Sequence, residues 1–322
     1  MLFGTSLWLW LVFGAVVIAL LAFDLGVLHG RDRQIGVKES LWLSAGYMGV
    51  ALLFAAGLGW QLGSESGMAF LTGYLIEKTL ALDNIFLISA IFTLLAVPPQ
   101  YQHKVLFWGI LGVIVSRALL IGLGAALVSE FHWVLYVFGA FLVATGIRMV
   151  IRPEAGMHGA TDGVLRWMRR HLRVTPEYHG NRFWVTAPES GPGTRRVLFA
   201  TPLLLALGLI EILDLIFAVD SVPAIFAVTQ DPFIVYTSNI FAILGLRALY
   251  FCLAVLVDRF HYLTYSLAAV LIFVGAKILA SDLLGEIPAW ASLVVTVGLL
   301  SAGVLYSLYR TRRPALSTQE FS

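Results

Sequence analysis

Nine stretches of this sequence are apolar over about 20 residues or more, and this feature limits the fold more than any other. They lie at 6–28, 40–62, 68–97, 104–128, 132–151, 198–228, 233–257, 261–281 and 287–309. A helix needs roughly 20 mainly apolar residues to cross a bilayer, where every backbone polar group must be paired within the protein. Only 12% of the residues are charged, against about 25% in soluble domains. The sequence therefore predicts an all-α polytopic membrane protein with about nine transmembrane helices.

The basic residues predict how the chain is oriented. Counted from the N-terminus, the odd-numbered connections and the C-terminal tail are basic, with Arg31, Lys104, Arg166, Arg259 and Arg310 as examples. The even-numbered connections contain no Lys or Arg. Because Lys and Arg accumulate on the cytoplasmic side of a membrane, we expect the N-terminus outside and the C-terminus in the cytoplasm. This orientation requires an odd number of spans.

One connection, 152–197, is long and polar. Within it, residues 164–173 combine arginines with apolar residues at helical spacing, which is typical of a basic amphipathic helix on a membrane surface. We expect this helix to bind anionic lipids of the inner leaflet and not a nucleic acid, because transmembrane segments flank it. Residues 188–193 contain two Pro and two Gly and predict a linker.

The halves of the chain on either side of this connection are similar to each other. The matching residues are Phe131–His132–Trp133 and Phe260–His261–Tyr262, Gly146 and Gly275, Arg117 and Arg247, and Glu77, Asp83 and Asn84 with Asp214, Asp220 and Ser221. Each half contains three predicted helices, in 68–151 and 198–282, and this odd number inverts the second half in the membrane. Residues 1–67 hold two helices before the repeat, and 283–322 hold the last helix and a basic tail. Inverted repeats are typical of secondary transporters with a site near the bilayer midplane.

Charged residues interrupt two of the apolar stretches, at 77–84 and 211–221. A charge at the bilayer centre costs at least about 2.5–3.5 kcal/mol on insertion scales, so it normally serves a ligand, a pathway or a partner charge. The candidate metal ligands are Glu77, Asp83, Asn84, Glu211, Asp214, Asp220 and Ser221, with Asn239 as a further oxygen donor. The bases at similar depth are Lys78, Arg117 and Arg247. If all are ionised, the acids exceed the bases by two charges, which a divalent cation would neutralise.

The residue types narrow the choice of metal. None of the His residues falls in the centre of a predicted span, and Cys252 is the single cysteine. Carboxylate, amide and hydroxyl oxygens suit Mg, Ca or Mn. Two other interpretations stay open: the acids and arginines pair only for structure, or the acids relay protons without a metal. We expect Arg117 and Arg247 to hold carboxylates in place.

Helix geometry sets a condition for a single shared site. In each stretch one acid shares a helical face with the polar residue seven positions later. These pairs are Glu77 with Asn84 and Asp214 with Ser221. Asp83 and Asp220 follow their acidic partners by six positions, and a regular helix turns them roughly 120° away. We therefore expect local unwinding at Asp83 and Asp220, and Pro223 gives a reason for a break in the second stretch.

At these residues the sequence resembles the TerC family of integral membrane proteins, most closely its Alx-type members. The motifs that carry the resemblance are Phe70–Leu–Thr–Gly–Tyr–Leu–Ile–Glu77–Lys78, Asp83–Asn84, Ala200–Thr–Pro–Leu, Phe217–Ala–Val–Asp220–Ser–Val–Pro–Ala–Ile–Phe226, Asp231–Pro–Phe and Phe241–Ala–Ile–Leu–Gly–Leu–Arg247. They cover residues 70–250, and the number of predicted helices extends the resemblance over the whole chain.

The resemblance implies a bacterial inner-membrane protein that exports manganese and belongs to a superfamily of transporters built from paired three-helix units. Family members are also associated with tellurium resistance and with the response to alkaline pH. The matching motifs imply a metal site formed by Glu77, Asp83, Asn84, Asp214 and Asp220, together with Glu211 and Ser221. Mn²⁺ is then a transported substrate, and no prosthetic cofactor is implied.

We therefore expect a secondary exporter of divalent cations, Mn²⁺ above all, and not an enzyme. The sequence contains no Gly-x-x-x-x-Gly-Lys motif for ATP binding. Coupling to protons is compatible with the site, because a carboxylate must release its proton before it binds a metal. One alternative is a non-transporting membrane scaffold or stress-resistance factor. Another is a membrane-embedded hydrolase, which the lack of His in the charged stretches disfavours.

Overall fold

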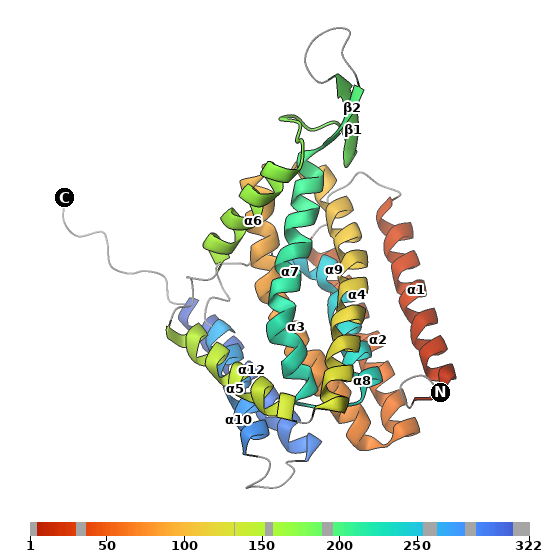
Figure 1. Cartoon of the computed structure of the whole chain (residues 1–322). Helices are drawn as coiled ribbons and strands as arrows, with labels where there is room; N and C mark the ends of the chain where they lie inside the picture. Colours follow the sequence, from red (N-terminus) through yellow and green to blue (C-terminus); the bar gives the residue numbers. More distant parts are fainter. Residues whose placement is uncertain are drawn as a thin grey trace, which may run out of the picture.

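The computed structural model describes residues 5–29, 37–131, 133–151, 157–188, 196–253, 263–280 and 288–311, and helices dominate them (Figure 1). The helices are α1 (Leu7–His29), α2 (Val37–Leu62), α3 (Ser64–Leu94), α4 (Pro99–Glu130), α5 (Trp133–Ile151), α6 (Met157–His171), α7 (Pro202–Phe226), α8 (Pro232–Leu244), α9 (Leu246–Leu253), α10 (Leu263–Leu279) and α12 (Ala289–Thr311). Two strands, β1 (Trp184–Pro188) and β2 (Arg196–Ala200), pair in an antiparallel hairpin.

Several of these helices have the length and composition of membrane spans. Within the described ranges, α1, α2, α4, α5 and α12 are long and apolar enough to cross a bilayer, while α8 and α10 are shorter apolar helices. α3 and α7 have 31 and 25 residues and carry the charged stretches. Each predicted segment contains a helix, and the seventh contains both α8 and α9. The described part of the chain is thus an α-helical membrane protein, whereas the number of spans stays a prediction.

The β1–β2 hairpin corrects the predicted start of the sixth span at residue 198. Ala200 pairs with Trp184 of β1, and α7 begins only at Pro202. Proline suits the first turn of a helix because its missing N–H would have no partner there. The short apolar strand before Pro202 could not be distinguished by hydropathy from the helix that follows it.

The two charged helices are regular where the sequence predicted unwinding. α3 is helical from Ser64 to Leu94 and α7 from Pro202 to Phe226, so both continue through positions 83 and 220. Pro223 lies inside α7, but so close to its end that the backbone hydrogen bond it removes belongs to the last turns. The expected unwinding at Asp83 and Asp220 is therefore wrong, and a single site shared by all the acids loses that support.

α3 and α7 lie in the interior of the helix assembly. α3 packs against α2, α8 and α12, α7 packs against α4, α5 and α6, and the two helices contact each other. Aromatic rings from α1, α2, α3 and α8 form one cluster. These rings belong to Phe13, Phe54, Phe70, Phe233 and Phe241. Aliphatic side chains, among them the fully buried Ile91 and Leu209, fill the contact of α3 with α4 and α7.

α5 and α10 pack along each other through glycines. A Cβ atom on Gly139 would lie 3.1 Å from the carbonyl oxygen of Gly275, and a Cβ atom on Gly275 would lie 2.6 Å from the carbonyl oxygen of Gly139. Small residues of this kind let the backbones of membrane helices approach closely. Any larger side chain at either position would force the two helices apart.

The seventh predicted span is divided between α8 and α9 at Gly245. The Nζ of Lys78, on α3, donates a hydrogen bond to the carbonyl of Ala242 at 3.0 Å, one of the last carbonyls of α8, which the helix end leaves unpaired. A Cβ atom on Gly245 would lie 2.8 Å from this Nζ, so the glycine leaves room for the ammonium. A cation at the C-terminal end of a helix is also favoured by the helix dipole.

α6 is the amphipathic helix predicted within 164–173. Leu165 and Met168 are buried, and a Cβ atom on Gly208 of α7 would lie 2.6 Å from the Met168 Cε atom. Arg166, Arg169 and Arg170 are exposed. The apolar face of α6 therefore packs on α7, the basic face points away from it, and the contact with anionic lipids stays a prediction.

Candidate functional site

Arg117, in the middle of α4, is the centre of a buried polar cluster. Val113 and Ile121, one turn before and after it, are buried, so Arg117 lies on the face of α4 that packs against other helices. Its side chain is 1% exposed. A buried charge is costly unless it is paired and hydrogen-bonded, and Arg117 is both.

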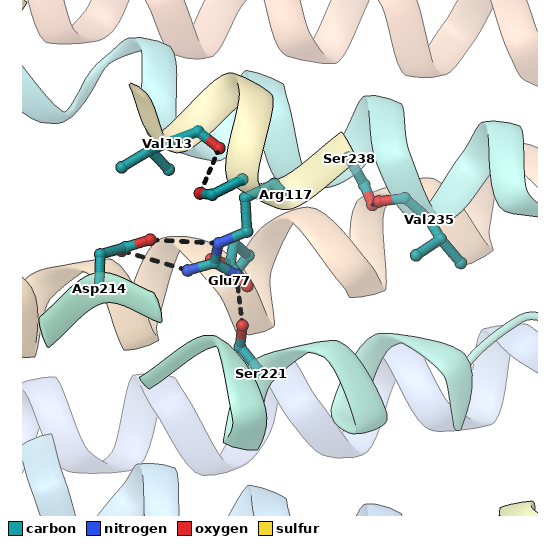
Figure 2. A network of polar contacts seen from close by, with 8 residues as sticks. Glu77, Val113, Arg117, Asp214, Ser221, Val235 and Ser238 are labelled. Carbon is teal, nitrogen blue, oxygen red and sulfur yellow. Dashed lines mark hydrogen bonds and ion pairs between the residues drawn. The ribbon is translucent and has the colours of Figure 1, made fainter. Parts of the chain in front are cut away.

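The guanidinium of Arg117 joins α3 to α7 (Figure 2). Its Nη1 lies 3.0 Å from Oε1 of Glu77 and donates to the Oγ of Ser221. Its Nη2 and Nε donate to the two carboxylate oxygens of Asp214 at 3.3 and 3.4 Å. Two parallel bonds of this kind fix the relative orientation of the two groups. Glu77 and Asp214, from the two halves of the proposed repeat, thus share one counter-ion.

The structure brings together three of the candidate ligands, Glu77, Asp214 and Ser221. Asp214 and Ser221 share a face of α7, as their spacing predicts, because both contact the same guanidinium. Arg117 holds the two carboxylates in place, as expected from the sequence. The side chains of Asp83, Asn84, Asp220 and Arg247 lie outside the described residues. The seven-residue metal site therefore stays a prediction.

Glu211 lies on α7 against α4, apart from the contacts of Arg117. A Cβ atom on Gly112 would overlap the Glu211 carboxylate, so this glycine creates the space that the carboxylate fills. Within the described part of the chain, Oε1 of Glu211 is buried and has no hydrogen-bond partner. The same is true of Oε2 of Glu77, although its other oxygen is paired.

The charges of the described cluster do not balance. Two carboxylates, Glu77 and Asp214, share the single guanidinium of Arg117. If all three are ionised, the cluster has one negative charge in excess, in surroundings where an uncompensated charge is costly. Among the described residues, no group of three or more His, Cys, Asp or Glu side chains is placed to hold a metal ion. In this conformation the guanidinium occupies the space between the two carboxylates.

A small apolar cavity ends on Asp214. Its volume is about 30 Å³, and Val113, Ile110, Ile210, Ile243 and Leu246 line it together with Asp214. A water molecule needs roughly 10–15 Å³ of such space, so the cavity is large enough for a water molecule or a dehydrated ion. Asp214 thus lines the cavity and also pairs with Arg117.

Two further buried polar groups accompany the cluster. Asn239 of α8 is 0% exposed, and neither its Oδ1 nor its Nδ2 has a hydrogen-bond partner in the described ranges. The hydroxyl of Tyr74, on α3, is also buried without a partner there. The sequence suggested Asn239 as an oxygen donor but not Tyr74. The available signal for Tyr74 was its place three residues before Glu77, which puts both on one side of a helix.

Long apolar helices that enclose buried ion pairs indicate an integral membrane protein with charged residues in its interior. The chain belongs to the TerC family of integral membrane proteins, whose family model matches residues 62–315. It is 47% identical to the membrane protein STKORF319 of Myxococcus xanthus, over 96% of this chain and 94% of that protein. It is 46% identical to a protein of Escherichia coli K12 provisionally named membrane-bound redox modulator Alx, over 92% of both chains. No solved structure matches the chain.

Proposed function

We propose that this protein is a secondary transporter that exports divalent metal cations from the cytoplasm through the carboxylate site between α3 and α7. The observation that carries the proposal is the shared guanidinium: Glu77 of α3 and Asp214 of α7 bind the two sides of Arg117 in the helix interior. Charged residues at such depth are costly and are typical of ion pathways. Carboxylates contributed by two helices can bind a cation between them and release it when the helices move apart.

The packing of the helices supports an inverted repeat. α3 packs on α8 as α7 packs on α4, α3 contacts α7, and α5 contacts α10. A two-fold axis that relates the unit α3–α5 to the unit α7–α10 exchanges α3 with α7, α4 with α8, and α5 with α10. The observed contacts are those that such an axis produces. In transporters built from such repeats, one unit rocks against the other around a fixed site. We therefore propose alternating access with the ion pairs of Arg117 near the axis.

The identity of the substrate rests on the ligands and on the family resemblance. Carboxylate and hydroxyl oxygens favour hard cations such as Mg²⁺, Ca²⁺ and Mn²⁺, and the resemblance selects Mn²⁺ among them. We propose the bacterial inner membrane as the location, with the N-terminus outside and the C-terminus in the cytoplasm. Proton coupling belongs to the same proposal, because Arg117 leaves the pair of carboxylates with an excess negative charge that either a proton or a metal can compensate.

Transport by the purified chain in sealed proteoliposomes tests the proposal. A fluorophore inside the vesicles that is quenched by Mn²⁺ reports entry of the ion. We expect Glu77→Gln and Asp214→Asn to lower transport at least about 10-fold, the scale of loss when even an outer-shell partner of a metal is removed. Glu65→Gln is the matched control, because Glu65 is an exposed acid at the start of α3.

The results separate errors of two kinds. If Glu77→Gln and Asp214→Asn transport Mn²⁺ as well as the wild type, transport is supported but the site is wrong. Asp83→Asn and Asp220→Asn then test the remaining acids. If the wild-type chain moves no divalent cation, the transport proposal itself is wrong.

The competing proposal is a non-transporting membrane scaffold or stress-resistance factor. The protein of Escherichia coli that is provisionally named membrane-bound redox modulator Alx has a name that mentions no transport. The exposed basic face of α6 would be the partner surface of such a scaffold. Replacing Arg166, Arg169 and Arg170 together by Gln separates the two functions: a scaffold loses its function in cells, whereas a transporter keeps its turnover in proteoliposomes.

A further inference from the structure

We infer that Asn239 of α8 is a further ligand of the transported cation and binds it through Oδ1, together with the unpaired Oε2 of Glu77. This inference rests on the proposed transport function and adds α8 to the site. Both residues are buried: Asn239 is 0% exposed and Glu77 is 1% exposed. Each of them has at least one buried oxygen without a hydrogen-bond partner within the described residues.

Asn239 differs from the two polar residues that precede it in α8, because their hydroxyls are hydrogen-bonded and its amide is not, within the described residues. Three consecutive polar residues of α8 are fully buried: Thr237, Ser238 and Asn239. The Thr237 hydroxyl donates to the carbonyl of Phe233 at 2.8 Å, and the Ser238 hydroxyl donates to the carbonyl of Val235 at 3.1 Å. Hydroxyls commonly bond back to the preceding turn in this way. The amide of Asn239 has no hydrogen-bond partner in the part of the chain that the structure describes, so its desolvation is not compensated there.

Contacts between α3 and α8 place Asn239 beside the stretch that carries Glu77. A Cβ atom on Gly73 would lie 2.9 Å from the Oγ of Ser238, and Lys78 bonds to the carbonyl of Ala242. Residues 73–78 of α3 therefore lie along residues 238–242 of α8. Glu77 and Asn239 both belong to these stretches.

The helical neighbours of Asn239 show which way its face of α8 points. Val235, one turn before it, packs in a cluster with Ile121 of α4 and Val222 of α7. Ile243, one turn after it, lines the cavity that ends on Asp214. Residues four positions apart share a helical face, so Asn239 lies between the apolar cluster and the cavity.

Arg117 has the same surroundings on α4. Ile121, one turn after it, belongs to that apolar cluster, and Val113, one turn before it, lines the cavity. Asn239 therefore lies on the level of Arg117 and faces the same space between the helices. Figure 2 shows Val235 and Ser238 of α8 in one view with the ion pairs of Arg117.

The chemistry of these groups fits a hard cation. An amide oxygen and a carboxylate oxygen are ligands that Mg²⁺, Ca²⁺ and Mn²⁺ accept. A neutral ligand on α8 would let α8 follow the cation when it binds, without adding a charge that has to be neutralised when the site is empty. The unpaired amide is then a cost of the empty site that binding removes.

Asn239→Leu in the full chain distinguishes a ligand from a structural amide. Leucine has a similar volume and no polar atoms, so we expect a melting temperature without metal at least equal to that of the wild type, because an uncompensated amide is removed. We also expect the KM for Mn²⁺ in proteoliposomes to rise at least about 10-fold and the increase in melting temperature on adding Mn²⁺ to shrink. Asn239→Asp keeps an oxygen ligand and retains the Mn²⁺-dependent increase. Thr237→Val, which removes a paired hydroxyl next to Asn239, is the control and changes neither value.

Two outcomes overturn the role of Asn239 while leaving transport intact. One is an Asn239→Leu variant with wild-type KM and wild-type stabilisation by Mn²⁺, as expected if only water meets the amide. The other is a lower melting temperature without metal in both Asn239 variants, which would make the amide structural. A wild-type chain that moves no cation rejects the proposed function instead, so the two failures are distinguishable.

Discussion

Replacing Arg117 by methionine tests whether its guanidinium is the counter-ion that stabilises the helix interior. Arg117 is 1% exposed, and its ion pairs with Glu77 and Asp214 measure 3.0 and 3.3 Å. Removing one partner of a buried ion pair costs about 3–5 kcal/mol, because the remaining charge is uncompensated. Methionine fills irregular space well and leaves little cavity. We expect Arg117→Met to lower the free energy of unfolding by about 3–5 kcal/mol.

Thermal unfolding of the purified chain in detergent, followed by tryptophan fluorescence, measures this loss. Arg170→Met is the matched control, because Arg170 is an exposed arginine of α6 and exposed substitutions usually change stability by less than about 0.5 kcal/mol. Combining Arg117→Met with Glu77→Gln and Asp214→Asn leaves no uncompensated charge in this cluster, so most of the stability should return. Wild-type stability of Arg117→Met, or a triple variant less stable than the single one, would refute the reasoning.

Three other predictions concern the packing of the helices and the loop after α6. Lys78→Met removes the hydrogen bond to the carbonyl of Ala242, which is worth about 1.5–3 kcal/mol for a charged donor. The amides of α9 should then exchange faster with deuterium, and unchanged exchange would contradict this prediction. Gly275→Ala places a Cβ atom 2.6 Å from the facing carbonyl oxygen of α5 and should cost about 1–3 kcal/mol in thermal unfolding, whereas an unchanged melting temperature would mean that the two helices separate freely. Burial raises the pKa of the Tyr178 phenol above the unfolded value of about 10. The contribution of the neutral phenol to the free energy of unfolding is therefore present below about pH 10 and is lost as the pH rises through the pKa of the folded state. Tyr178→Phe should not show this loss of stability at alkaline pH when unfolding is measured over a pH series. If both chains lose the same stability, Tyr178 is not the source of the loss.

Hydropathy predicted the helical segments well, because the length of a membrane span is a local property of the sequence. It did not predict the β1–β2 hairpin, since apolar residues 197–200 read equally well as the beginning of the helix that starts at Pro202. The division between α8 and α9 was missed for a similar reason. Gly245 lies inside an apolar run, and the contact with Lys78 that accompanies the break comes from a distant part of the chain.

The part of the candidate site that consists of ion pairs could be predicted from the sequence. Arg117, Glu77 and Asp214 had to find partners at their depth, and the structure pairs them. The predicted unwinding at Asp83 and Asp220 failed, because it assumed that every acid converges on one point. Regular helices satisfy their own backbone hydrogen bonds, which in a bilayer outweighs the convergence of side chains. The unpaired state of Asn239 could not be foreseen, because it depends on which neighbouring groups come within reach.

The contact between Gly139 of α5 and Gly275 of α10 joins the two proposed units and marks the point about which they can pivot. Backbones in direct contact leave little room to slide, so spin labels on the exposed positions Val137 of α5 and Leu279 of α10 should report a smaller change of distance during transport than labels farther from this contact. A label on the exposed Leu123 of α4, paired with Leu279, would report any rocking of the two units. Because Cys252 is the single cysteine of the chain, one substitution removes the background for such labelling.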